Sequence, residues 1–280
     1  MELRCGSSVL SLERAAIMGV LNVTPDSFSD GGLWLDPDAA IKHGLEMVDQ
    51  GGAIVDVGGE STRPGATPIP EDEELRRVLP VIEGLVNHGV EFVSIDTRKP
   101  SVARRALEAG ANIINDTAGE ESDRAMDAIA AETGAAIVVM HSRGTPETMK
   151  TLTGYSAVVQ DIRRFLEGRA HELEANGVPR SAIALDPGIG FAKSAEQSAL
   201  LLRDIGSLVA LGYPVLVGAS RKSFMGHLLD LDDGQRLEAT LATTTYVVAH
   251  GVAIVRVHDV EANVRAARMA EAIVRSDEMA

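Results

Sequence analysis

The sequence predicts a (β/α)8 barrel (TIM barrel), an α/β fold in which parallel strands alternate with helices around a closed sheet. Short β-branched apolar runs alternate with longer amphipathic stretches about eight times along the 280 residues. Most of the runs are apolar on both faces, as in a parallel sheet that is covered all round. No GxGxxG pattern follows any run, which disfavours the main rival, a doubly wound open sheet.

The predicted strands are short, and each precedes a helical pattern. In chain order the strands are 16–21, 53–58, 92–96, 112–116, 136–141, 182–186, 214–219 and 253–258. The helical patterns are 37–50, 71–87, 100–108, 122–133, 155–176, 195–211, 235–250 and 261–275. Glycine follows several of them, as expected where a helix stops before a strand, at Gly51, Gly89, Gly110, Gly134, Gly177, Gly212 and Gly251.

Residues 1–280 are predicted to form a single domain, because no linker or low-complexity stretch divides them. Residues 1–14 are expected to form a small N-terminal hairpin that closes the bottom of the barrel. They lack both a basic n-region and a sustained apolar segment, so no secretory signal is predicted. No apolar run approaches the length needed to cross a bilayer.

Charge and cysteine content exclude several classes of protein. The formal net charge of −15 disfavours nucleic acids and anionic membranes as partners, because both bind a basic face. Cys5 is the only cysteine, which excludes an intrachain disulfide and a cysteine-based zinc cluster. The histidines show no spacing typical of a zinc site. We therefore expect a cytoplasmic protein that acts on small molecules.

Polar side chains stand at or just beyond the C-terminal ends of the predicted strands, which in a barrel meet at one mouth. A lone Asp at a strand end is often only the N-cap of the next helix. Here the carboxylates lie with an amide and a lysine, a set of donors and acceptors suited to a flat, nitrogen-rich heterocycle. The residues at these ends are Asn22, Asp56, Asp96, Asn115, Asp116, His141, Asp186, Ser220, Arg221, Lys222, Arg256 and His258.

A group of cations comes from distant parts of this acidic chain: Arg63, Arg221, Lys222, Arg256 and His258. In one mouth, with loop amides and helix N-termini, they would form a diphosphate site without any Walker sequence. A lone histidine is more often structural than catalytic. The Arg-x-His pairing at a strand end favours a functional role for His258, whereas His141 receives no assignment.

Eight segments carry a resemblance to one family: "MGVLNVTPDSFSDGG", "DVGGESTRPGA", "SIDT", "NDTAG", "MHSRGTPETM", "DPGIGFAK", "GASRKS" and "RVHD". From residue 18 to 260 the chain resembles the dihydropteroate synthases, folate-biosynthesis enzymes that sulfonamides inhibit. The resemblance implies a barrel transferase that joins 6-hydroxymethyl-7,8-dihydropterin diphosphate to 4-aminobenzoate and releases pyrophosphate. It also implies a homodimer.

The resemblance further implies which residues form the site. The pterin pocket maps onto Asp96, Asn115, Asp186 and Lys222, with Met140 and Phe191 packed beside it. The diphosphate site maps onto Thr62, Arg63, Arg256 and His258, and the Mg²⁺ ligand onto Asn22. The aminobenzoate site maps onto Phe28, Pro64, Lys222 and Ser223. Catalysis is expected to depend on Asn22, Asp96, Lys222, Arg256 and His258.

The expected chemistry suits these residue types. Loss of diphosphate from a CH₂ group on an electron-rich pterin leaves a cation delocalised into the ring, and the family is thought to react in this dissociative way. Mg²⁺, arginine and histidine would stabilise the leaving anion, and carboxylates the positive ring. Two segments depart from the usual pattern: "NDTAG" replaces Asn-Asp-Val-Ser-Gly and "GFAK" replaces Gly-Phe-Gly-Lys. Neither change removes a group assigned above.

Two other functions stay open. A corrinoid-linked methyltetrahydrofolate methyltransferase resembles this family in its barrel and its Asp/Asn pterin pocket. It would have no use for the diphosphate cations or for the long loop after Asn22. A non-catalytic pterin-binding paralogue is the second alternative, and loss of Asn22, Arg63, Lys222 or Arg256 would have indicated it. None of the four is lost.

Overall fold

The computed structural model describes residues 1–24, 36–63 and 65–276, and its central feature is a parallel β-barrel. The eight barrel strands pair in the order β8-β7-β6-β5-β4-β3-β10-β9. A parallel bridge between Leu185 and Val215 joins the two remaining edges, β8 and β9, and the Leu185 N–H donates to Pro214 O across 2.9 Å. The predicted barrel is therefore confirmed. The strands are β3 (Ala16–Asn22), β4 (Ile54–Gly58), β5 (Val93–Thr97), β6 (Ile113–Asp116), β7 (Ala136–Met140), β8 (Ile183–Asp186), β9 (Leu216–Val217) and β10 (Ile254–Val257).

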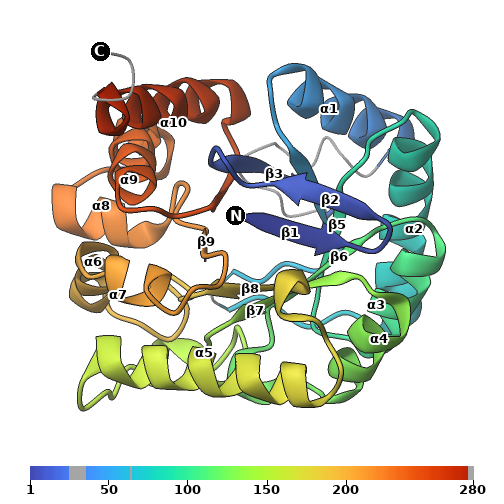
Figure 1. Cartoon of the computed structure of the whole chain (residues 1–280), viewed down its shortest axis with the longest axis horizontal. Helices are drawn as coiled ribbons and strands as arrows, with labels where there is room; N and C mark the ends of the chain where they lie inside the picture. The colour runs from blue at the N-terminus through green and yellow to red at the C-terminus, as the bar shows by residue number, and fades with distance from the viewer. Residues whose placement is uncertain (25–35, 64, 277–280) are drawn as a thin grey trace.

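Helices surround the barrel and follow its strands in turn (Figure 1). Since β-branched residues and leucines on the outward faces of the strands pack against these helices, both faces of the sheet are buried. No described helix is long and apolar enough to span a membrane. The helices are α1 (Pro37–Asp49), α2 (Glu71–Asn87), α3 (Pro100–Glu108), α4 (Ala125–Thr133), α5 (Val158–Ala175), α6 (Ala195–Arg203), α7 (Gly206–Val209), α8 (Ser223–Leu229), α9 (Leu237–Ala249) and α10 (Val260–Val274).

The helices of the structure differ from the predicted ones at several points, most clearly at 195–211, at residue 122 and at α8. The single helix expected over 195–211 is two, α6 and α7, since α6 ends at the C-cap Asp204 and Gly206 starts the next turn. The helix expected from residue 122 begins only at Ala125, because Ser122 bonds the Asp116 carboxylate instead. Helix α8 was not predicted, since its seven residues are too few to show a helical period.

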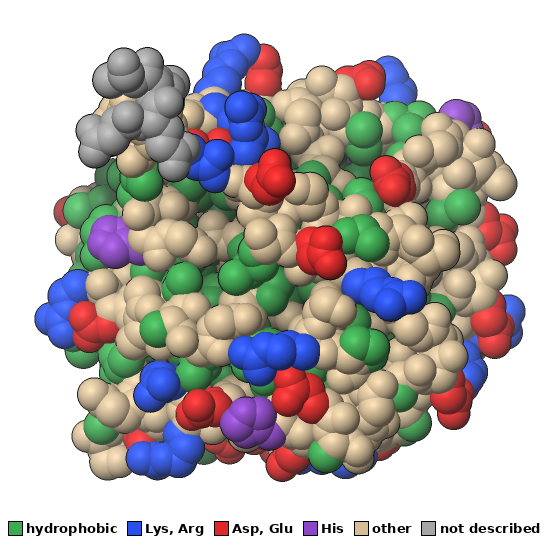
Figure 2. Space-filling model, in the orientation of Figure 1, with side chains coloured by type: hydrophobic (Ala, Val, Ile, Leu, Met, Phe, Trp, Pro, Cys, Tyr) green, Lys and Arg blue, Asp and Glu red, His purple; other side chains and the backbone are tan. Residues whose placement is uncertain are grey.

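The N-terminal residues form a hairpin of β1 (Glu2–Cys5) and β2 (Ser8–Ser11), paired antiparallel. Its buried side chains, Leu3, Cys5, Leu10 and Leu12, join the inward-facing apolar residues at the N-terminal ends of the barrel strands. Figure 1 shows the hairpin lying in front of the barrel strands. In Figure 2 the same face carries basic and acidic side chains side by side. The bottom of the barrel is thus closed by apolar packing.

The side chains inside the barrel change from apolar to polar along each strand. Successive residues of a strand point to opposite sides, so Ile54 and Asp56 face the interior while Val55 faces the helices. By the same alternation, the side chains of Ile254 and Arg256 on β10 face the barrel interior. Polar side chains therefore meet at the C-terminal end of the barrel, opposite the hairpin.

Candidate active site

Arg256 bridges two carboxylates inside the mouth of the barrel. Its Nε donates to Asp56 Oδ2 across 2.6 Å, and its Nη2 donates to Asp96 Oδ2 across 2.7 Å. Asn115 Nδ2 donates to the same Asp56 oxygen at 3.1 Å, and Thr117 Oγ1 to Asp96 Oδ1 at 3.1 Å. Asp56 is fully buried and Asp96 is 5% exposed. Residues from β4, β5, β6 and β10 are thereby tied into one polar cluster.

Asp56 belongs to this polar cluster, although the sequence pattern does not assign it to the site. The sequence places it at a strand end but gives it no role in the predicted site. The available signal was a carboxylate in the middle of the apolar run "AIVDVG". A buried charge of this kind requires a partner, and the structure supplies Arg256 from 200 residues away.

Three buried polar atoms in this cluster have no hydrogen-bond partner among the described residues: Asp56 Oδ1, Ser94 Oγ and Asn115 Oδ1. They belong to the adjacent strands β4, β5 and β6, on the interior side. Leaving such an atom unsatisfied costs about 1–3 kcal/mol. The arrangement therefore fits a ligand that brings hydrogen-bond donors into the barrel.

Burial raises the pKa of two carboxyl groups here, Asp96 and Asp186. It raises the pKa of Asp96 to about 7, although the positive charge of Arg256 opposes the rise. It also raises the pKa of Asp186, which lies at the end of β8, is 5% exposed and accepts from the Gly188 N–H at 2.7 Å. Both carboxylates are poised for a ligand that stabilises their ionised form.

Lys222 completes this side of the mouth. It is the N-cap residue of α8, and its Nζ donates to the Ile189 carbonyl. The same amine lies 4.0 Å from the centroid of the Phe191 ring. Burial lowers the pKa of Lys222 to about 7, against the pull of the nearby Asp186 carboxylate. Met140, the last residue of β7, is buried and pairs in register with Asp186.

The predicted cations surround His258. Its Nδ1 lies 3.0 Å from Ser220 Oγ, which also accepts from the His258 backbone N–H at 3.2 Å. Burial lowers the pKa of His258 to about 3, and the positive charges of Arg256, Arg221, Arg63 and Lys222 lower it further. The structure thus brings the five groups into one electrostatic neighbourhood. Arg221 differs from the others, because Asp259 binds its guanidinium at 2.5 and 2.9 Å and neutralises its charge.

The remaining predicted residues are placed as follows. Asn22 ends β3 and pairs in register with Gly58. Thr62 and Arg63 lie in the loop between β4 and α2, and Thr62 lines a small cavity together with Phe191. Ser223 is the first residue of α8. Phe28 and Pro64 lie outside the described residues.

The family model described as pterin binding enzyme matches residues 18–258. The chain is 46% identical to the dihydropteroate synthase of Synechocystis over 94% of this chain and 91% of that protein. It is 40% identical to the dihydropteroate synthase of Escherichia coli over 99% and 98% of the two chains.

The chain belongs to the dihydropteroate synthase family of pterin-binding enzymes. Solved structures agree. The Yersinia pestis dihydropteroate synthase in complex with a sulfonamide drug matches with a TM-score of 0.93 and 39% identity, over 99% of this chain and all of that one. The Thermus thermophilus dihydropteroate synthase in complex with 4-aminobenzoate matches with a TM-score of 0.87 and 42% identity, over 98% and 100%. The predicted family resemblance and barrel fold are therefore confirmed.

Within this dihydropteroate synthase fold, Lys99 anchors the loop that carries Thr62 and Arg63. Its Nζ donates to Glu60 Oε2 at 2.7 Å, to Glu74 Oε2 at 2.6 Å and to the Ile69 carbonyl at 2.9 Å. Glu60 also accepts from the Ile69 N–H at 2.9 Å. The two ends of the loop are therefore clamped together. No pattern in the sequence indicated this anchor, because its members are distant along the chain.

Proposed function

We propose that this chain condenses 6-hydroxymethyl-7,8-dihydropterin diphosphate with 4-aminobenzoate to give 7,8-dihydropteroate and pyrophosphate. The observation that carries the proposal is the group of buried, unpaired atoms Asp56 Oδ1, Ser94 Oγ and Asn115 Oδ1 inside the mouth. A pterin is flat and presents ring N–H and amino donors along one edge, so it would satisfy acceptors of this kind. The Thermus thermophilus relative has been solved in complex with 6HMPPP, and the Clostridium difficile relative in the presence of pteroic acid.

The carboxylates stabilise the reacting ring in this proposal. Donors on the pterin favour the ionised forms of Asp96 and Asp186, whose pKa values are raised by burial when no ligand is bound. As the diphosphate leaves, positive charge develops on the methylene carbon and spreads into the ring. Two fixed negative groups close to that ring lower the energy of this transition state. The aniline nitrogen of aminobenzoate then attacks the methylene carbon and its proton passes to the released pyrophosphate or to water, so no dedicated base is required.

The leaving diphosphate is assigned to the cations around His258. Arg63 lies in the loop after β4, Arg256 lies on β10 and His258 follows β10 directly; the charges of Arg63 and Arg256 both lower the pKa of the His258 imidazole. Thr62 and loop backbone amides add neutral donors. Arg256 also contacts Asp96 and Asp56, so it links the diphosphate end of the site to the pterin end. Charge-assisted hydrogen bonds of this type are the strongest that a protein offers to a diphosphate.

Mg²⁺ is proposed as the cofactor, with Asn22 as its protein ligand. The described residues contain no group of three His, Cys, Asp or Glu side chains able to hold a metal. Asn22 at the end of β3 offers an amide oxygen, a hard donor that suits Mg²⁺. Mg²⁺ is commonly held by one or two protein ligands together with substrate phosphates and water, so this donor set fits. When bound, the ion supplies charge neutralisation of the leaving diphosphate.

A coupled assay tests the proposed reaction. Purified protein with Mg²⁺ and both substrates is expected to release pyrophosphate in step with a product that contains the aminobenzoate ring. Omission of aminobenzoate, or chelation of Mg²⁺, should abolish product formation. Asn22→Ala should raise the Mg²⁺ concentration needed for half-maximal rate. Methyl transfer from methyltetrahydrofolate to a corrinoid protein, with no condensation, would overturn the proposal.

We also propose that the chain is a homodimer in the cytoplasm. Both statements rest on the family relationship. Sedimentation equilibrium at micromolar concentration should give twice the chain mass, and a monomer under those conditions would contradict the first statement. Recovery of the protein in the cytoplasmic fraction of the source cell tests the second.

A further inference from the structure

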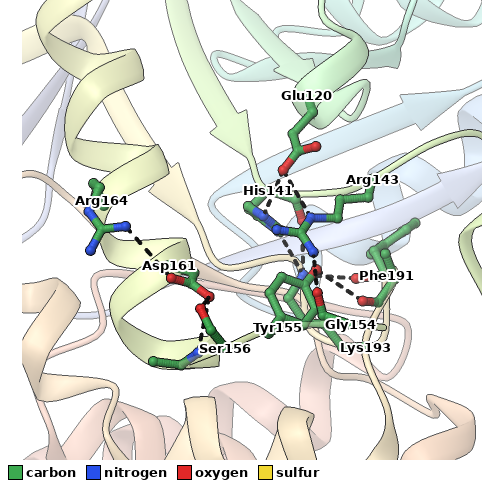
Figure 3. Close-up of polar contacts among 12 residues, drawn as sticks. Glu120, His141, Arg143, Gly154, Tyr155, Ser156, Asp161, Arg164, Phe191 and Lys193 are labelled. Carbon is green, nitrogen blue, oxygen red and sulfur yellow. Dashed lines mark hydrogen bonds and ion pairs between the residues drawn. The ribbon is translucent and has the colours of Figure 1, made fainter. Parts of the chain in front are cut away.

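Lys193 is a buried amine that the proposed reaction does not use. It lies in the turn after β8 and is 8% exposed. Its Nζ donates to the carbonyl oxygens of Phe191 at 2.8 Å and His141 at 3.1 Å, and lies 3.0 Å from His141 Nδ1 (Figure 3). Burial lowers the pKa of this amine well below its usual range. These three contacts, to two carbonyl oxygens and one ring nitrogen, fix the position of the amine.

His141 serves this amine as a fixed acceptor. The imidazole is 1% exposed, lies edge-on to Phe165 with 4.9 Å between ring centroids, and has a pKa lowered to about 2 by burial. It is therefore neutral at working pH. With Nδ1 accepting from Lys193, the ring proton is assigned to Nε2, which faces Glu120 Oε1 at 3.7 Å. The histidine that had no role in the sequence thus has a structural partner.

The backbone beside Lys193 is held in an unfavourable conformation. Ala192 has φ +48°, in the left-handed region that a residue with a Cβ rarely adopts. Hydrogen bonds hold the carbonyl groups of the two peptides that flank the Ala192 Cα. Phe191 O accepts from Lys193, and Ala192 O accepts from the Tyr155 hydroxyl at 3.0 Å. Tyr155 is itself covered by Arg143, whose Cζ lies 4.0 Å from the ring centroid. The chain has alanine at a position where glycine would relieve this strain.

The same turn supplies the contacts of Lys222. The Ile189 carbonyl accepts from the Lys222 amine, and the Phe191 ring lies 4.0 Å from it. A change in the peptide between Phe191 and Ala192 would move that ring. The position of the Lys222 amine in the mouth therefore depends on the turn that Lys193 and Tyr155 hold.

We propose that Lys193 and Tyr155 are positioning residues, which clamp the strained turn at Ala192 and so hold Phe191 and Ile189 against Lys222. The inference rests on the proposed function of Lys222 in substrate binding. Neither residue is assigned a proton transfer in the proposed reaction. Both act through the conformation of residues 189–192.

A matched pair of tyrosine variants separates positioning from stability. Tyr155→Phe removes one hydroxyl, the one bonded to Ala192 O. Tyr213→Phe removes one hydroxyl bonded to Glu174 Oε1 at 3.0 Å, and this tyrosine lies three residues before β9, at the opposite end of the barrel. We expect Tyr155→Phe to lower kcat/KM for the pterin diphosphate about three- to ten-fold, the loss of roughly one hydrogen bond. Tyr213→Phe should leave kcat/KM unchanged.

A double variant tests the strain directly. Lys193→Met should lower kcat/KM about ten-fold or more, since three bonds are lost. Because glycine adopts positive φ without strain, Ala192→Gly in the Lys193→Met background should restore a large part of that loss. Ala192→Gly alone should change kcat/KM less than two-fold. If the Lys193→Met chain does not fold, the tyrosine pair decides the question.

Binding of a non-reactive pterin distinguishes the two proposals. Titration of pterin-6-carboxylate into each variant measures pterin binding without catalysis. Tyr155→Phe should lower the affinity for this pterin by a factor similar to its effect on kcat/KM. An active native protein whose Tyr155→Phe and Lys193→Met variants bind and turn over normally would overturn the positioning role alone. A native protein that binds the pterin but forms no product would overturn the proposed reaction. The pterin titration would still test the positioning role of Lys193 and Tyr155.

Discussion

Arg256 Nη2 donates to Asp96 Oδ2 across 2.7 Å, which joins a residue expected at the diphosphate to a residue expected at the pterin. The two ends of the site are therefore coupled by a charged hydrogen bond between β10 and β5. A substitution of Arg256 should therefore also affect Asp96. It removes the positive charge that opposes the rise in the pKa of Asp96 caused by burial.

Substitutions at Asp186 and Arg256 should separate the pterin from the diphosphate. Asp186→Ala is expected to weaken pterin and pterin diphosphate alike, measured by calorimetry. Arg256→Ala should weaken the diphosphate form by roughly 1.5–3 kcal/mol, the value of a charge-assisted hydrogen bond. It should weaken plain pterin by a smaller amount, through Asp96. Equal losses for both ligands in both variants would show that Arg256 does not bind the diphosphate.

Sulfonamides should compete with 4-aminobenzoate. Both are anilines with an acidic or polar group at the para position, and the site assigned to that ring includes Lys222 and Ser223 at the start of α8. A related enzyme from Yersinia pestis has been solved with a sulfonamide drug. A higher concentration of 4-aminobenzoate should raise the apparent inhibition constant of the sulfonamide in proportion. Inhibition that does not change with aminobenzoate would place the drug elsewhere.

Loosening the clamp on the Thr62–Arg63 loop should weaken substrate binding without unfolding the chain. Glu60→Ala removes the carboxylate that accepts from Lys99 and from the Ile69 N–H, but leaves the buried Glu74 paired with Lys99. The KM for the pterin diphosphate should rise about ten-fold, which corresponds to roughly 1.4 kcal/mol. Glu132→Ala, which breaks an exposed pair with Arg104, is the matched control and should leave KM unchanged. A similar KM in both variants would mean that the clamp does not order the loop.

The free energy of unfolding of the ligand-free chain should decrease as the pH decreases, because its histidines are buried. His258 has a pKa of about 3 in the folded chain against about 6.5 when unfolded, so the unfolded state binds more protons below pH 6.5. The stabilising contribution is present above pH 6.5 and is lost as the pH falls toward 3. In His258→Asn, the loss of unfolding free energy between pH 7 and pH 5 should be smaller by roughly 1–2 kcal/mol than in the native chain. Urea titrations at both pH values measure this, and equal losses would contradict the burial of a neutral imidazole.

Much of the fold was predictable because its signals are local. Each barrel strand is a short run such as "AIVVMH" that is apolar on both faces, and each is followed by a periodic helix with a glycine stop. Short elements carry no such signal, so α8 was missed and the break between α6 and α7 was not seen. Those boundaries depend on caps and packing rather than on period.

The sequence by itself determined the chemistry present at the strand ends: Asp96, Asn115, Asp186, Lys222 and Arg256 follow from strand alternation and family motifs. Only the tertiary structure decided which groups are paired. Asp56 meets Arg256 across 200 residues, and Asp259 neutralises Arg221. The positive φ of Ala192, held by Lys193 and Tyr155, is equally invisible in the chain order. The physical reason is that hydrogen bonds and pKa shifts arise from distance and burial, which barrel closure creates between residues that are remote in sequence.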